Sequence, residues 1–362
     1  MKNYNENEAL FADWAGDARN ASPDGEFVRD TNYIEDRIVA SVSERTRQDP
    51  DRADSAELWP VAAGKYRLIA ARACPWAHRT LIVRRLMGLE NVISLGLAHP
   101  IHDVRSWNFQ LDEGGLDPVL QIPRLQEAYF NRFPNYPRGI TVPAIVDIET
   151  KQVVTNDYAS ITLDFNSEWK QFHREGAPDL YPEELREEID AVNKRVFTEV
   201  NNGVYRCGFA GTQEAYGKAY DRLFTALDWL EERLSTRRYL VGDHITEADV
   251  RLFPTLVRFD ACYFSHFKCN RNMIKDMPNL WGYLRDLFQT PGFGDTTDLD
   301  QVKAHYYGTH TEINPTRVIP KGPRMADLLT PHDRDRLPGQ PFAPGSTAPG
   351  PVPESEQPPA VH

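Results

Sequence analysis

The sequence contains little cysteine and no long apolar run. Only four of its 362 residues are Cys, and their irregular spacing is not that of a small secreted disulfide-bonded protein. No stretch of about 18 apolar residues occurs, and the polar start at residues 1–8 lacks the apolar core of a signal peptide. These absences predict a soluble, cytoplasmic protein.

Positive charge is also scarce. Lys and Arg number 41 against 53 Asp and Glu, which gives a formal net charge of −12. Nucleic acids and anionic membranes bind to basic surfaces, so neither is expected as a partner. A chain of this length predicts two domains and buries enough surface to fold without disulfides or a structural metal.

The pattern of apolar residues divides the chain into four parts. Residues 1–60 are polar and predict an extended arm held by scattered aromatic side chains, although plain disorder has a similar composition. Strand-like runs occupy residues 61–170, and helical spacing occupies residues 171–323. Residues 324–362 are rich in proline and predict a disordered tail. The aromatic residues of the arm are Phe11, Trp14, Phe27, Tyr33 and Trp59.

A strand, a turn, a helix and a second strand open the second part. Apolar runs at residues 66–71 and 92–97 predict the strands. Between them, residues 80–87 have the apolar spacing of a helix, and Gly88 is placed to end it. The pattern predicts a βαβ unit, which requires a parallel pair of strands.

Two further strands are predicted at residues 141–147 and 151–154. Pro143, near the start of the first, is a candidate cis-proline, with an ordinary trans-proline as the alternative. Beyond residue 156 the spacing of apolar residues changes to three and four, which predicts helices. The helical segments are residues 183–200, 213–235, 247–262 and 278–289.

Cys74 is the strongest candidate for chemistry. It lies between the first strand and its helix, with Pro75 at the first helical position. A thiol there faces unpaired N–H groups and the positive end of the helix dipole, which predicts a lowered pKa. Ala77 stands where a dithiol motif has its second Cys, so an outside thiol would be needed. The alternative is a buried, inert Cys. Further positive charge is expected from Arg72, His78 and Arg79.

The other cysteines and one Thr-x-x-Asp motif are interpreted as structural. Cys207, Cys262 and Cys269 are not spaced like metal ligands, and His266 beside them is too little for a zinc site. No metal is therefore expected. The motif at 246–249 predicts a capping box at the start of a helix.

Several motifs together resemble the Xi class of glutathione transferases, the glutathionyl-hydroquinone reductases. The resemblance covers roughly residues 10–323. It implies a thioredoxin-like α/β N-terminal domain, followed by an all-α C-terminal domain, and a homodimer. The motifs are Cys74–Thr80, Thr141–Pro143, Asn156–Asp157, Gly203–Ala210, Leu256–Asp260, His266–Cys269, Asn279–Arg285, Thr290–Phe293, His305–Tyr307 and Ile313–Pro315.

The resemblance also implies a reaction. Cys74 would attack the sulfur of an S-conjugated hydroquinone and be held as a mixed disulfide, which a second thiol molecule would then resolve. Tyr205 would donate or accept the proton that lets the aromatic ring leave. Tyr263 and Tyr306 would lie near the thiolate and tune it. The implied thiol-binding residues are Trp107, Gly139, Ile140, Thr141, Val142, Asp157 and Tyr158.

One pair departs from the family pattern. Members usually carry Glu-Ser where this sequence has Asp157-Tyr158, and that pair normally binds the γ-glutamyl end of glutathione. Asp157 has one methylene less, and the Tyr158 ring would crowd the space of a small hydroxyl. Mycothiol has no γ-glutamyl end, and its sugar could stack on a tyrosine. The thiol is therefore expected to be glutathione or, favoured by this pair, mycothiol.

Two alternatives to the hydroquinone reaction stay open. General monothiol exchange on small disulfides would use Cys74 but not Tyr205. A non-catalytic binding protein could keep the same fold with an unreactive Cys74, because a fold does not guarantee a function.

Overall fold

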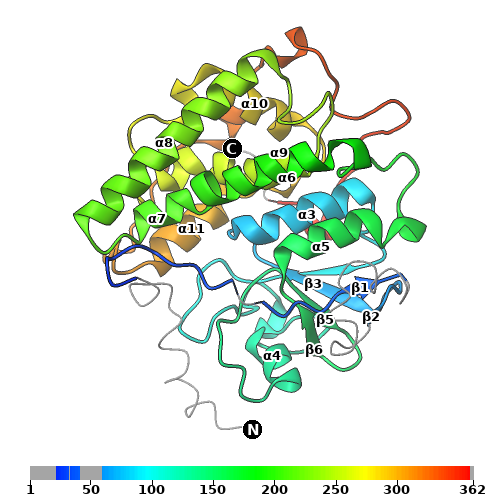
Figure 1. Cartoon of the computed structure of the whole chain (residues 1–362). Coiled ribbons are helices and arrows are strands. Elements are labelled where there is room, and N and C mark those ends of the chain that lie inside the picture. The colour runs from blue at the N-terminus through cyan, green and yellow to red at the C-terminus, as the bar shows by residue number, and fades with distance from the viewer. Residues whose placement is uncertain (1–21, 32, 41–58, 359–362) are drawn as a thin grey trace.

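The computed structural model describes residues 22–31, 33–40 and 59–358 (Figure 1). Its strands are β1 (Ile38–Val39), β2 (Trp59–Pro60), β3 (Tyr66–Ala70), β4 (Ser94–Leu97), β5 (Ala144–Asp147) and β6 (Gln152–Thr155). Its helices are α3 (Pro75–Met87), α4 (Gln126–Arg132), α5 (Tyr158–Ser167), α6 (Arg186–Arg195), α7 (Gly203–Gly208), α8 (Gln213–Thr236), α9 (Glu247–Arg258), α10 (Pro278–Gln289) and α11 (Leu299–Thr309). Segments of π-helix, Val196–Asn201 and Phe259–Tyr263, continue α6 and α9.

The main sheet has four strands in the order β4-β3-β5-β6. β3 pairs with β4 in parallel, as the predicted βαβ unit requires, and β5 is antiparallel to both its neighbours. Every residue of β3 is buried, because this strand is covered on both faces. Helices α3 and α5 pack together above the sheet, and α4 lies against β6 below it (Figure 1). This arrangement confirms the predicted fold class.

Helix α3 begins and ends where the sequence predicts. Pro75 is its first residue, and Gly88 ends it in the left-handed conformation with a φ of 74°. The Gly88 N–H donates to the carbonyl groups of Arg84 and Arg85. Cys74 therefore occupies the N-cap position of this helix.

Strand β5 begins later than predicted. The predicted strand started at residue 141, whereas β5 starts at Ala144, directly after Pro143. Proline has no N–H group to donate to a sheet, which explains the delay. The Val142–Pro143 peptide bond is cis, the first of the two alternatives that the sequence left open.

The helical half contains all four predicted segments, and α9 packs against α3 (Figure 1). The predicted capping box of α9 is present: the Thr246 N–H donates to Asp249 Oδ2 at 2.8 Å. Asp249 Oδ1 also accepts from the Leu240 N–H and the Tyr283 hydroxyl, which joins α9 to α10. Within the described part of the chain, no helix combines the length and apolar character needed to cross a membrane.

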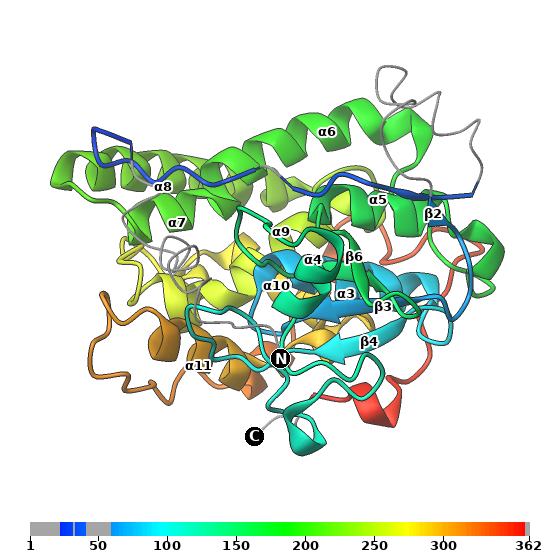
Figure 2. The ribbon, with the colours of Figure 1, turned by 90° about the horizontal axis from the view of Figure 1, so that it is seen from below.

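The described part of the arm runs extended along both halves (Figure 2). Its Gly25 carbonyl accepts from the Gly211 N–H, and further along both backbone groups of Ile34 are hydrogen-bonded to the 155–156 corner. Phe27 and Trp59 are buried, so both help to hold the segment as expected. Phe11 and Trp14 lie outside the described residues.

The tail differs from the predicted disorder as far as residue 358. Arg334 is fully buried and donates to the Leu234 carbonyl at 2.7 Å. Glu356 accepts from both terminal nitrogens of Arg84, at 2.7 and 2.8 Å. The prediction counted only apolar surface, whereas this tail is held by charged side chains that find partners on the folded body.

Candidate active site

A cavity of about 210 Å³ lies where the two halves meet the arm. The thioredoxin-like half contributes Cys74 and Trp76 to its wall, and the helical half contributes Tyr205. Residues Phe27 and Arg29 of the arm line it as well. The cavity therefore draws on three separate parts of the chain, which is typical of a ligand site between domains.

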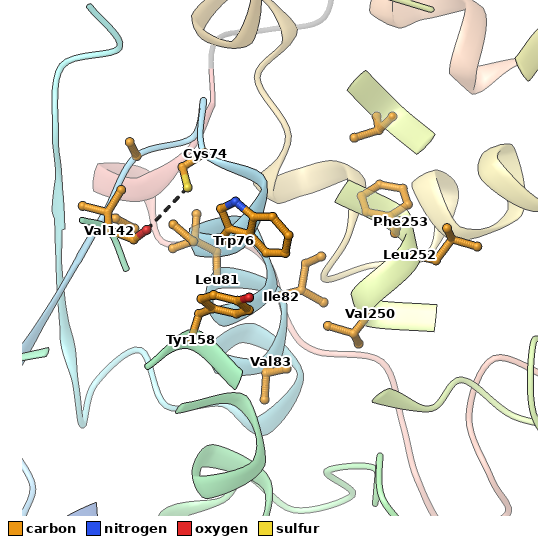
Figure 3. Packing of buried hydrophobic residues seen from close by; sticks show 14 of the residues in the cluster. Cys74, Trp76, Leu81, Ile82, Val83, Val142, Tyr158, Val250, Leu252 and Phe253 are labelled. Atoms are coloured by element: carbon orange, nitrogen blue, oxygen red, sulfur yellow. Dashed lines mark hydrogen bonds between the residues drawn. The ribbon is translucent and has the colours of Figure 1, made fainter. Parts of the chain in front are cut away.

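The Cys74 side chain lines this cavity and is 8% exposed. Its Sγ donates to the Val142 carbonyl at 3.5 Å (Figure 3). Burial raises the pKa of the Cys74 thiol, so the predicted net lowering is wrong. The opposing, pKa-lowering groups are the N–H groups of Ala77 and Trp76 and the guanidinium groups of Arg258 and Arg29. The helix N-terminus acts in the predicted direction, but burial outweighs it.

His78 does not supply the positive charge expected of it. Arg258 donates to His78 Nδ1 at 3.1 Å, so the ring proton is on Nε2, which donates to Thr296 Oγ1 at 2.9 Å. Burial, together with the charge of Arg258, lowers the pKa of His78 well below its ordinary value. The imidazole is therefore neutral and structural.

Of the two arginines expected to add positive charge, Arg79 does interact electrostatically with Cys74, and Arg258 and Arg29 add to it. Arg72 donates to the Glu356 carbonyl and Arg79 to Asn201 Oδ1, and neither lines the cavity. Arg258 instead donates to the carbonyl groups of residues 72 and 73, at 2.6 and 3.0 Å, and so holds the turn before Cys74. Sequence reasoning missed this role; the signal was an arginine inside an apolar helical segment.

Three tyrosine hydroxyl groups form a chain beside the cavity. Tyr306 lies between Tyr205, at 2.6 Å, and Tyr263, at 2.8 Å. Only Tyr205 lines the cavity, while the other two are buried behind it. Burial raises the pKa of all three phenols, so each hydroxyl keeps its proton.

Most of the residues expected to hold the thiol do line the cavity. They are Trp107, Gly139, Thr141, Val142 and Tyr158. Ile140 does not: its side chain is fully buried, and its carbonyl accepts from Ser106 Oγ at 2.6 Å. Burial removes Ile140 from direct contact with a ligand in this cavity.

Asp157 and Tyr158, the pair that differs from the family pattern, have different positions in the structure. Asp157 caps α5, accepting from the Ala159 N–H at 3.1 Å and from Ser160 Oγ at 2.5 Å. Asp157 does not line the cavity, so it does not take the predicted position for pairing with the ammonium group of a thiol ligand. The Tyr158 ring lies against Trp76, with centroids 4.8 Å apart, and fills the space beside it (Figure 3).

Sequence reasoning missed Asn156, Arg29 and His305. Asn156 accepts from the Ile34 N–H at 2.7 Å and donates to Thr141 Oγ1 at 2.8 Å, so it ties the arm to the predicted thiol loop. Burial lowers the pKa of His305 to about 3, so its imidazole is neutral where it lines the cavity. Asn156 and His305 stand in two of the family motifs, which gave them no role, and no local pattern marks Arg29, since only folding brings their partners close.

The remaining cysteines do not form part of the site. Cys207, Cys262 and Cys269 are free and buried, and none of them lines the cavity. Across residues 22–31, 33–40 and 59–358, no cluster of three or more His, Cys, Asp and Glu side chains is arranged to hold a metal ion.

Comparison with known proteins matches this arrangement to one family. The model of the glutathione S-transferase C-terminal domain matches residues 211–286. A glutathionyl-hydroquinone reductase of Sphingobium chlorophenolicum is 46% identical over 263 residues, covering 72% of this chain and 83% of that protein. A glutathione transferase structure from Gordonia bronchialis is 63% identical with a TM-score of 0.85, covering 91% of this chain and 98% of its own.

A further structure is informative because of its ligand. The glutathione-bound structure of a glutathione transferase homologue from Escherichia coli K-12 is 42% identical, with a TM-score of 0.72. The match covers 76% of this chain and 89% of that one. Identity at this level over most of the chain shows common descent. The chain belongs to the Xi class of glutathione transferases, the family of the glutathionyl-hydroquinone reductases.

Proposed function

We propose that this protein removes the thiol from S-conjugated hydroquinones through a mixed disulfide at Cys74. The observation that carries the proposal is that Cys74 and Tyr205 line one cavity. The relatives named glutathionyl-hydroquinone reductases support the same substrate class. A nucleophile and a proton donor facing one space are the minimum that this reaction needs.

The reaction has two steps. In the first, the Cys74 thiolate attacks the sulfur of the conjugate; the S–S bond forms, the carbon–sulfur bond breaks, and the ring carbon gains a proton. In the second, a free thiol molecule attacks the mixed disulfide, releases an oxidised disulfide of the small thiol and restores Cys74. The hydroquinone ring loses its thiol substituent, and two small thiols supply the electrons.

Tyr205 is the proposed acid for the ring carbon. Because burial raises the pKa of its phenol, Tyr205 stays protonated until it transfers the proton to the ring carbon. Tyr306 lies 2.6 Å behind it and can replace the proton through the hydroxyl chain. Tyr263 and Tyr306 thus act through Tyr205 rather than on the substrate.

The thiol is proposed to be glutathione or mycothiol, with mycothiol favoured. The names of the relatives support glutathione. The two departing residues support mycothiol, because the Asp157 carboxylate is engaged in capping a helix and the Tyr158 ring fills the adjoining wall. A sugar can stack on an aromatic wall, whereas an ammonium needs a carboxylate facing it.

The proposal also includes a cytoplasmic location and a homodimeric state. Light scattering coupled to gel filtration measures the oligomeric state.

Mass spectrometry of the intact protein tests the proposal. Brief incubation with a hydroquinone conjugate of mycothiol, and separately of glutathione, is expected to add the mass of one thiol to the wild type and nothing to Cys74→Ser. The thiol that adds faster identifies the co-substrate. Absence of an adduct from both conjugates would refute the chemistry and leave the family assignment standing.

A second candidate, thiol exchange on small disulfides, rests on one observation. The contacts that position Cys74, from its Sγ to the Val142 carbonyl and from Arg258 to the Ala73 carbonyl, do not involve the tyrosine chain. Tyr205→Phe separates the two candidates, because it removes the acid for the ring carbon and leaves disulfide exchange intact.

A further inference from the structure

We propose that Arg29, supplied by the N-terminal arm, is a catalytic residue: its guanidinium binds the ring oxygen that becomes negatively charged as the thiol leaves. This inference rests on the proposed function and names a group that the sequence did not point to. The arm would then contribute a residue to the active site, in addition to packing against both halves of the protein.

The position of Arg29 is fixed by stacking. Its guanidinium carbon lies 4.6 Å from the ring centroid of Trp76 and 4.6 Å from that of Tyr205. Its Nε donates to Asn202 Oδ1 at 2.5 Å. The group therefore lies over the proposed acid Tyr205 and faces the cavity beside Cys74.

The charge of Arg29 is not neutralised by any described residue. Its Nη2 is buried and has no hydrogen-bond partner among residues 22–31, 33–40 and 59–358. The other arm arginine, Arg37, forms an ion pair with Asp164. Arg29 as a whole is partly buried, and an anion entering the cavity would give its buried, unpartnered Nη2 group a hydrogen-bond acceptor and its charge a counterion. The unoccupied donor thus points to an anionic ligand group.

Among the described residues, Arg29 is the one arginine of the cavity wall with this character. Arg138 also lines the cavity, but it is 41% exposed and pairs with Asp30 at 2.9 Å. Arg79 stacks on the Trp76 ring as well, yet it does not line the cavity. Arg29 is therefore the cavity arginine whose charge remains available to a ligand.

The proposed reaction creates an anion in this space. An aryl carbanion is a very poor leaving group, so the ring must first become a dienone: the ring carbon takes a proton from Tyr205, and a ring hydroxyl releases its proton to water. When the thiolate of Cys74 attacks sulfur, the carbon–sulfur electron pair restores the aromatic ring and the carbonyl oxygen becomes a phenolate. Water then returns the proton to this oxygen, and the proton that the second thiol releases when it resolves the mixed disulfide restores the Tyr205 hydroxyl. A fixed cation stabilises charge that develops on oxygen.

The experiment compares two substrates on the full-length enzyme. Arg29→Met is expected to lower kcat for the hydroquinone conjugate by about 100-fold, the usual loss when one such donor is removed. Exchange with a dialkyl disulfide forms no ring oxyanion, so its rate is expected to fall only a few-fold. Arg29→Lys is expected to recover part of the kcat. Chlorinated rings, whose phenols are more acidic, are expected to show a smaller loss.

Two controls separate catalysis from anchoring. Arg37→Met removes an arm arginine that holds the arm outside the cavity, and it is expected to affect both substrates equally. The rate of Cys74 alkylation, measured on each variant together with its circular dichroism and melting temperature, reports any change in the thiolate or the fold.

The outcomes are distinct. Equal losses on both substrates in Arg29→Met, or the same substrate-selective loss in Arg37→Met, would overturn the inference and leave Arg29 as an anchor of the arm. Full activity of Arg29→Met would overturn it too. Absence of hydroquinone turnover in the wild type would instead refute the proposed function, and this inference with it.

Discussion

The hydroxyl oxygen of Tyr306 lies 2.6 Å from that of Tyr205 and 2.8 Å from that of Tyr263. Of these three side chains, only Tyr205 reaches the cavity. The arrangement places one tyrosine at the cavity and two more hydroxyl groups behind it. Each member is therefore expected to matter to a different degree.

Tyr205→Phe is expected to lower turnover of the hydroquinone conjugate by about 100-fold or more, since a positioned general acid contributes that much. Exchange with a small disulfide should be retained, because it needs no proton on a ring carbon. Steady-state kinetics with both substrates measures the difference. Tyr216→Phe is the matched control: its hydroxyl donates to the Lys268 carbonyl, away from the cavity. A similar loss in that control would contradict the assignment of the acid.

The reactivity of Cys74 is expected to rise with pH into the alkaline range. Burial raises the pKa of its thiol, so the thiolate that reacts is scarce below the ordinary value of about 8.5 and increases above it. The rate of alkylation by iodoacetamide as a function of pH measures this. Arg258→Met removes a cation that lowers the Cys74 pKa, and it should move the curve to still higher pH. A plateau already reached at pH 7 would contradict the prediction.

Tyr158→Ser is expected to shift thiol preference toward glutathione. The change removes a ring from the cavity wall and restores the small hydroxyl that the family carries there. The ratio of kcat/KM for the two thiols measures preference, and it should move several-fold. Tyr158→Phe keeps the ring and should leave the ratio unchanged. An unaltered ratio in both variants would mean that Tyr158 does not select the thiol.

Glu356→Gln is expected to destabilise the fold by about 2 kcal/mol, somewhat less than a fully buried ion pair, because it leaves a buried guanidinium without its counterion. Arg84 is 1% exposed, whereas Glu356 is 15% exposed and holds it with two hydrogen bonds. Denaturant unfolding of the full chain measures the change. Glu354→Gln, an exposed neighbour on the same turn, serves as control. Equal stability of the two variants would show that the tail contributes little.

The sequence by itself determined the elements around Cys74. Pro75 and Gly88 mark the two ends of α3, and Thr246 with Asp249 opens α9, whereas β5 begins at Ala144 and not at the predicted residue 141. The helix ends are predictable because each depends on the conformational preference of a residue and on neighbours within one turn of the chain.

The sequence motifs of the helical half also identified the three tyrosines as candidates. Their order along the chain resembles a known family, and this resemblance is what singles out residues 205, 263 and 306 in the sequence. Composition predicted the tail poorly, since it registers apolar content and not the charged partners that Arg334 and Glu356 find on the body.

Only the tertiary structure decided the electrostatics of the site. The direction of the Cys74 pKa depends on burial by residues far along the chain, and it opposes what the helix N-terminus alone predicts. The Asp157 side chain caps the helix that follows it, and Arg29 of the arm lies over the rings of Trp76 and Tyr205. Burial and the pairing of charges depend on which distant segments meet, and that information is not local to any stretch of the sequence.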